Sequence, residues 1–120
     1  MSGLEVIGAV TTALAVISKL TQWFKSRRNN PIQVQRLERM LDELSDRRLI
    51  AIASDEELRS IARLVEACTE VLAEQESKYR TNRLSTFFFP ADAEAKLKEQ
   101  NDVIAEDLTR LYARVRIYAR

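Results

Sequence analysis

The sequence predicts an all-α protein, a four-helix bundle with up-down-up-down topology and an apolar N-terminal helix. Helix breakers are scarce: the chain has 2 glycines, Gly3 and Gly8, and 2 prolines, Pro31 and Pro90. Apolar residues also recur three and four positions apart through long charged stretches, which is the spacing of one helix face. Few breakers between such stretches favour long helices with short connections. The length of 120 residues suits one domain.

The composition argues against catalysis. The chain contains no histidine and one cysteine, Cys68, so histidine acid–base chemistry, histidine metal ligands and thiolate clusters are absent. The sequence has no glycine-rich phosphate loop, no GxSxG and no calcium-loop spacing. We therefore expect no enzyme activity, no catalytic residue, no cofactor and no metal, with Cys68 serving as a small buried apolar residue.

The first expected helix covers about residues 4–24. Residues 6–18 carry no charge, and the apolar side chains occupy every side of the helix. A helix that is apolar all round lies in a protein core or enters lipid. A membrane span needs about 20 mainly apolar residues, and polar residues from Thr11 to Gln22 dilute this one. The pattern leaves both possibilities open, a central core helix and an inserting helix. Glu5, with no base before Lys19, disfavours a secretory signal.

The second and third expected helices have clear start signals. Asn30 and Pro31 suit an N-cap and a first helical position. The helix that follows reaches about residue 53, with an irregularity near residues 45–47 where its apolar stripe shifts. Ser54 and Glu57 then form a capping box that starts the next helix. Its heptad seam consists of Leu58, Ile61, Val65, Cys68, Leu72, Gln75 and Tyr79.

A loop is expected at about residues 82–91, and the last helix runs from about residue 91. The seam of that helix consists of Leu97, Asn101, Ile104, Leu108, Leu111, Val115 and Tyr118. No C-cap signal precedes the final residue, Arg120. We therefore expect residues 1–120 to be the N-terminal part of a longer protein.

Basic and aromatic residues are expected to meet at one end of the bundle. In up-down-up-down topology the end of the first helix lies beside the end of the third helix and the start of the fourth. Trp23 and Phe24 occupy the position of an interfacial aromatic anchor. The expected surface for docking on anionic phospholipid consists of Lys25, Arg27, Arg28, Lys78, Arg80, Arg83, Phe87, Phe88 and Phe89. Alternatively, the phenylalanines fold inward and cap the core.

A nucleic-acid partner is not expected. The basic clusters are "KSRR" and the tail "RLYARVRIYAR", but the net charge is only +1. A basic footprint extending over the whole domain is missing.

The opening "MSGLEVIGAVTTALAVISKL" resembles the start of the fungal HeLo-like domains. These domains stand at the N-terminus of fungal NOD-like receptors and of related cell-death executioners. The shared pattern is Met, a small polar residue, Gly-Leu-Glu, and then a run of Val, Ile, Gly and Ala. The first 20 or so residues carry the resemblance. The rest of the chain agrees in being a helical bundle of suitable length.

The resemblance implies a bundle related to the HeLo domain of heterokaryon-incompatibility proteins. In that family the domain is cytoplasmic when inactive. Oligomerisation by a NOD-like receptor or an amyloid-signalling partner releases the N-terminal helix, which permeabilises the plasma membrane. The inserting segment would be residues 4–20, with Glu5 as its lone acid. Its apolar residues are Leu4, Val6, Ile7, Val10, Leu14, Val16, Ile17 and Leu20.

Two functions follow as expectations. The first is a membrane-permeabilising, pore-forming domain of innate immunity and programmed cell death that self-associates on an anionic phospholipid membrane. The second is a helical adaptor that binds a partner helix or a second copy and never enters lipid.

Overall fold

The computed structural model describes residues 3–26, 32–81 and 90–118, and within them the chain is helical with no strand. The elements are α1 (Gly3–Ser26), α2 (Ile32–Leu44), α3 (Arg47–Ile52), α4 (Asp55–Thr81) and α5 (Ala91–Tyr118). The all-α class and the apolar N-terminal helix are confirmed. The described part has five helices where the sequence predicted four, because the second predicted helix is divided in two.

The division falls at the predicted irregularity. Helix α2 ends at Leu44, where the backbone N–H of Ser45 donates to the carbonyl oxygens of Leu41 and Asp42, at 3.1 and 3.3 Å. Asp46 then caps α3, its carboxylate accepting from the backbone N–H of Arg48 at 2.9 Å. An aspartate in this position satisfies a helix-end N–H that has no partner inside the helix. The chain therefore turns between α2 and α3 instead of continuing as one helix.

The capping box before α4 is confirmed. The backbone N–H of Ser54 donates to Glu57 Oε1 at 3.0 Å, and the N–H of Glu57 donates to Ser54 Oγ at 3.1 Å. These reciprocal bonds satisfy two backbone donors at the helix start. Two further acids, Asp55 and Glu56, lie in the first turn, where the positive end of the helix dipole favours them.

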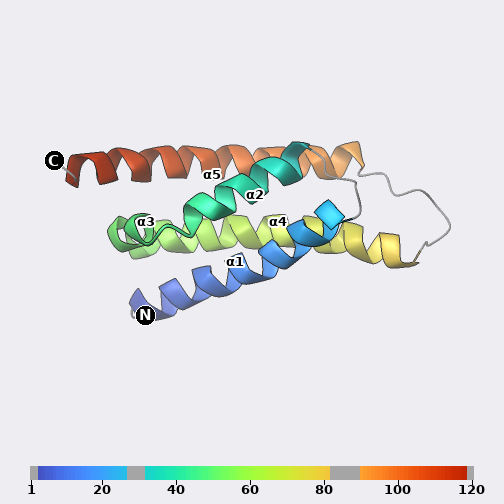
Figure 1. Ribbon diagram of the computed structural model, residues 1–120, viewed down its shortest axis with the longest axis horizontal. Coiled ribbons are helices and arrows are strands. Elements are labelled where there is room, and N and C mark those ends of the chain that lie inside the picture. The colour runs from blue at the N-terminus through green and yellow to red at the C-terminus, as the bar shows by residue number, and fades with distance from the viewer. Residues whose placement is uncertain (1–2, 27–31, 82–89, 119–120) are drawn as a thin grey trace.

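The helices form an elongated bundle of 55 × 27 × 22 Å. Figure 1 shows α1 and α4 running in one direction and α2 and α5 in the other. Helix α1 packs chiefly against α4 and also against α2, while α5 packs against α4, α2 and α3. The order around the bundle is therefore α1, α4, α5, α2. The main neighbour of α1 is therefore α4, which runs parallel to it. Short connections between consecutive helices would by themselves place antiparallel helices side by side.

The two predicted heptad seams form the centre of the bundle. Six seam residues of α4, from Leu58 to Gln75, are buried, and Tyr79 is half-buried. In α5 the seam is buried from Leu97 to Leu111. Cys68 is fully buried, as predicted, and the loss of solvent raises the pKa of its thiol to about 12.

Candidate functional site

Helix α1 lies between α4 and α2 in the ring of helices and buries a single stripe. The stripe consists of Val6, Val10, Ala13, Ile17, Thr21 and Phe24. These positions recur every three or four residues, the spacing of one helix face. On the flanks Ile7 is 37% exposed and Val16 is 46% exposed. The structure therefore shows α1 as a helix of the bundle with one face in the core and its flanks toward solvent.

The residues predicted to enter lipid are divided among three environments. Val6, Val10 and Ile17 are buried, Leu14 and Leu20 are half-buried, and Ile7 and Val16 are exposed. The side chain of Leu4 lies outside the described residues. The folded bundle therefore buries only some of these apolar side chains.

The segment Glu5–Ser26 is long and apolar enough to cross a membrane, judged by length and composition alone. At about 1.5 Å per residue, a helix of 24 residues spans about 36 Å, against about 30 Å for the hydrocarbon layer. The core helix of a soluble protein and a signal sequence near the N-terminus can pass the same test. In α1, 28% of the apolar window is buried, which is close to the share in α4, where 7 of 27 residues are buried.

The two halves of α1 pack against different clusters. Val6 and Val10 belong to a small cluster with Leu58 and Ala62 of α4. Farther along, Ile17 and Phe24 belong to the main core. The N-terminal half therefore rests on a satellite cluster, whereas the C-terminal half is joined to the centre of the bundle.

Open grooves flank α1 on both sides. A groove of about 700 Å³ separates it from the α2–α3 junction and from α3, with Leu14 and Ile50 on opposite walls. Another, of about 610 Å³, runs between Val16 and Leu20 of α1 and Ala73 of α4. Both grooves are open to solvent, so α1 borders a surface groove on each side.

Aromatic and charged groups hold the C-terminal end of α1. The Trp23 ring packs edge-to-face on Phe24 and on Tyr79 of α4, with centroid distances of 4.9 and 5.4 Å. The Arg80 guanidinium lies 5.9 Å from the centroid of the Trp23 ring. Lys25 Nζ lies 3.4 Å from a carboxylate oxygen of Glu38 in α2. This end of α1 therefore contacts both of its neighbours through specific side chains.

The structure places three of the predicted docking residues, and each is paired with an acid. Lys25 pairs with Glu38 at 3.4 Å, Lys78 with Glu74 at 3.2 Å, and Arg80 with Glu76 at 2.8 Å; the three basic side chains are 62–63% exposed. The contact of Arg80 with Trp23 brings the ends of α1 and α4 together, as predicted.

The remaining predicted docking residues lie outside the described residues: Arg27, Arg28, Arg83, Phe87, Phe88 and Phe89. Exposed ion pairs contribute about 0–1 kcal/mol, so a lipid phosphate can compete for the three cations that are placed. The partners of Lys78 and Arg80 could have been found from their spacing of four residues. The partner of Lys25 could not, because it comes from another helix.

A polar contact between α2 and α5 was not foreseen. Asn101 is fully buried, and its Nδ2 donates to the backbone oxygen of Gln33 at 2.9 Å. The backbone N–H of Gln33 donates to Glu94 at 3.0 Å, and Arg36 pairs with Asp102 at 2.6 Å. The Arg36 guanidinium and then the Lys98 ammonium lower the pKa of the Asp102 carboxyl. These bonds fix α2 on α5, whereas the stripe of α1 is mainly apolar.

Among the described residues no group of three or more Cys, Asp or Glu side chains is placed to hold a metal ion. No family model, curated protein or solved structure matches the chain. The likeness of the opening segment to HeLo-like domains therefore stays a prediction. The candidate functional site is α1 itself, with its partly exposed apolar surface, its flanking grooves and the basic end beside Trp23.

Proposed function

We propose that this protein permeabilises membranes by releasing α1 from the bundle and inserting it into lipid. The observation that carries the proposal is that α1 has the length and composition of a membrane span while the bundle buries one stripe of it. Together with the HeLo-like opening, this supports a cell-death function. The protein would be cytoplasmic when inactive and would reach the plasma membrane when a NOD-like receptor or amyloid-signalling partner oligomerises it.

The free energies of the two states of α1 are close. In the bundle α1 buries Val6, Val10, Ile17 and Phe24, each contributing about 1.5–3 kcal/mol, or roughly 6–12 kcal/mol together. Lipid would bury these side chains and also Ile7 and Val16. Against this gain, a lysine such as Lys19 costs about 2.5–3.5 kcal/mol at the bilayer centre and less near the interface. A difference of a few kcal/mol is within reach of self-association.

The exposed position of Val16 allows a sharper test than a buried one. Val10→Asp would place a charge at a site that is 2% exposed and would disrupt the bundle itself. Val16→Lys keeps the new charge in water while the protein is folded, but carries it into hydrocarbon on insertion. We expect normal folding and a loss of dye release from phosphatidylcholine–phosphatidylserine vesicles of tenfold or more, since about 1.4 kcal/mol is a factor of ten.

Ala73→Lys is the matched control. Ala73 is exposed on α4 and lines the same groove as Val16, so the substitution adds the same charge at the same surface but outside the proposed inserting helix. We expect it to leave dye release unchanged. Unimpaired leakage by the Val16→Lys protein, with circular dichroism like that of the wild type, would exclude insertion of α1.

Docking on anionic lipid is tested separately. Replacing Lys25, Lys78 and Arg80 together with glutamine removes the three placed cations, each able to contribute about 1 kcal/mol near an anionic surface. We expect weaker co-sedimentation with phosphatidylserine vesicles and little change with phosphatidylcholine vesicles. Equal binding of the wild type and the triple variant to the anionic vesicles would show that these three cations do not dock the protein on lipid.

The exposed Ile7 and Val16 beside the grooves also suit the second candidate, an adaptor that binds a partner helix. Flotation separates the two functions. A membrane-permeabilising domain floats with anionic vesicles and releases their contents, whereas an adaptor remains at the bottom of the gradient after forced clustering.

A further inference from the structure

The groove between α1 and the α2–α3 side has the dimensions and surface of a ligand site. Its volume is about 700 Å³, within the range of about 300–1,000 Å³ of small-molecule pockets. Ile7, Leu14 and Ala15 of α1 form one wall, and Ile50 and Ala51 of α3 form the other. The groove is elongated along a helix and open to solvent on one side, which suits a flexible chain.

Three hydroxyl residues line the groove, Thr11, Ser18 and Ser45, and two of them donate their hydrogens to nearby backbone carbonyls. Thr11 Oγ1 donates to the carbonyl oxygen of Ile7 at 2.9 Å, and Ser45 Oγ donates to that of Leu41 at 2.9 Å. With these hydrogens used, the surface offered to a ligand is dominated by methyl and methylene groups. An apolar chain can therefore lie against Thr11 and Ser45 without leaving their hydroxyl donors unpaired.

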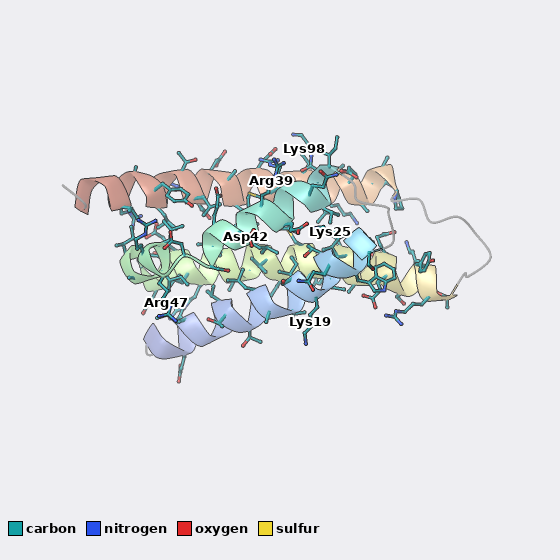
Figure 2. The ribbon with its side chains drawn as sticks, in the orientation of Figure 1. Lys19, Lys25, Arg39, Asp42, Arg47 and Lys98 are labelled. Carbon is teal, nitrogen blue, oxygen red and sulfur yellow. The ribbon has the colours of Figure 1, made fainter. Side chains whose placement is uncertain are left out.

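Arg47 is the single charged residue of the groove lining. Its side chain is exposed and, among the described residues, forms no ion pair, whereas its neighbour Arg48 is bound to Asp46 at 2.9 Å. Figure 2 draws Arg47 over the N-terminal part of α1. No carboxylate lines the groove. The charge balance therefore favours an anion at one end of an apolar channel, since a guanidinium binds phosphate or carboxylate through paired N–H donors.

We propose that this groove binds a single-chain anionic amphiphile, such as a fatty acid or an alkyl phosphate. The chain lies between Leu14 and Ile50, and the anionic head binds Arg47. Because α1 forms one wall, the site exists only while α1 is docked. A ligand that binds one state stabilises that state, so occupancy holds α1 in the bundle. The binding site stands without the proposed function, while the consequence that the amphiphile opposes membrane insertion rests on it.

The probe is dodecyl phosphate below its micelle concentration, with dodecyl maltoside as the neutral comparison, measured by isothermal titration calorimetry on the full chain. We expect saturable binding of dodecyl phosphate with one site per chain and at least tenfold weaker binding of the maltoside. Arg47→Gln should weaken the binding of dodecyl phosphate about tenfold. Arg48→Gln removes the same charge one residue away and should leave the affinity unchanged.

The apolar half of the site is tested by filling it. Ala51 is exposed and lines the groove, so Ala51→Trp blocks the channel from the α3 side while keeping Arg47. We expect loss of dodecyl phosphate binding with a circular dichroism spectrum like that of the wild type. In the wild type, bound dodecyl phosphate should slow amide exchange in residues 5–15 of α1.

Several outcomes would overturn the proposal. Equal affinity for the maltoside and the phosphate, or equal effects of Arg47→Gln and Arg48→Gln, would show that the groove does not recognise an anion through Arg47. A dimer in light scattering that excludes the probe would assign the groove to a second copy of the chain. Val16→Lys, on the opposite flank of α1, should still bind the probe, so a failure of membrane insertion leaves the groove to be judged on binding alone.

Discussion

At the residue scale, Glu57 joins the start of α4 to α5. Its carboxylate accepts a hydrogen bond from the backbone N–H of Ser54 as part of the capping box. It also accepts hydrogen bonds from Nη1 and Nη2 of Arg114 in α5. The Arg114 guanidinium, aided by the Ser54 bonds, lowers the pKa of the Glu57 carboxyl to about 2, although partial burial opposes the shift. Glu57 thus fixes the α3–α4 corner against the last helix.

The lowered pKa of Glu57 gives a pH prediction. A carboxyl whose pKa is lower in the folded than in the unfolded chain stabilises the fold above its ordinary value of 4.5, and this contribution is lost as the pH falls from there through about 2. Solvent screens the pair, which is 38% exposed on the Arg114 side. We expect Glu57→Gln to lower the free energy of unfolding by about 1–2 kcal/mol at pH 7.

Urea denaturation at pH 7 and at pH 2.5 measures this effect. The difference between wild type and Glu57→Gln should shrink at the lower pH, where part of the wild-type carboxylate is protonated. A difference that is equal at both values would show that the ion pair does not carry the effect. Glu56→Gln, an exposed neighbour in the same first turn, is the control.

Gly8 supplies a prediction of opposite sign. It lies inside α1, and a Cβ added there would meet nothing within 4 Å. Glycine inside a helix is less favourable than alanine by about 0.5–1 kcal/mol. We therefore expect Gly8→Ala to raise the free energy of unfolding by about that amount in urea titrations. Ala9→Gly, at the exposed position beside Gly8, should lower the free energy of unfolding by a similar amount. A destabilising effect of Gly8→Ala would contradict the prediction, because it would require a close contact at Gly8.

At the scale of elements, α1 is a helix with two unequal halves. Its N-terminal half packs on the satellite cluster with Leu58 and borders the groove beside α3, whereas its C-terminal half is held by the main core and by the Trp23–Tyr79 contact. Regions with few buried contacts open locally at low free energy. Release of α1 should therefore begin at its N-terminal end.

Hydrogen exchange provides the measurement. Amides of residues 7–12 should exchange at least tenfold faster than those of residues 17–24, which is more than helix-end fraying alone predicts for the second and third turns. Phe24→Ala removes the largest fully buried side chain of α1 and should abolish the difference by loosening the C-terminal half, at a cost of about 3–5 kcal/mol. Uniform protection along α1 in the wild type would contradict stepwise release.

At the scale of the whole molecule, α1 closes the bundle. The ring is α1, α4, α5 and α2, so removal of α1 leaves α5 with α4 on one side and α2 on the other. Arg36 donates to Asp102, and Asn101 donates to the backbone oxygen of Gln33; these bonds keep α2 on α5. The strip uncovered between α2 and α4 is apolar, and large exposed apolar patches promote association.

Deletion of residues 1–26 tests this arrangement. We expect the remaining chain to keep its helical circular dichroism, to bind a fluorescent apolar dye and to self-associate in light scattering. The physical reason is that the uncovered core residues, such as Leu58, which packs with Val6 and Val10, need a new apolar cover. A monomeric deletion protein without dye binding would show that α1 is dispensable and that its release exposes no surface for oligomerisation.

Sequence periodicity correctly predicted which faces of the long helices α4 and α5 are buried. The α4 seam from Leu58 to Gln75 and the α5 seam from Leu97 to Leu111 are buried as predicted, because helix geometry fixes which side chains share a face. Local hydrogen-bonding chemistry also placed the Ser54–Glu57 cap. The break at residues 45–47 was expected as an irregularity but becomes a true division, since the Asp46 side chain satisfies the start of α3.

The candidate site was predicted less completely. The apolar character of α1 follows from composition, but its stripe of burial does not, because nearly every side of this helix is apolar and periodicity cannot choose among them. The pairing of Lys25 with Glu38 and the Asn101–Gln33 bond join residues far apart in the chain. Such contacts depend on which helices become neighbours.

The sequence by itself determined the helical class, the helix ends with local caps, the two heptad seams and a first helix apolar enough for lipid. Each of these depends on residues within a few positions of one another. Only the tertiary structure decided that α1 lies between a parallel α4 and an antiparallel α2, that grooves flank it and that Arg47 lines one of them. These features arise because packing minimises exposed apolar area over the whole chain, and the free energy of any one helix face depends on the neighbour that covers it.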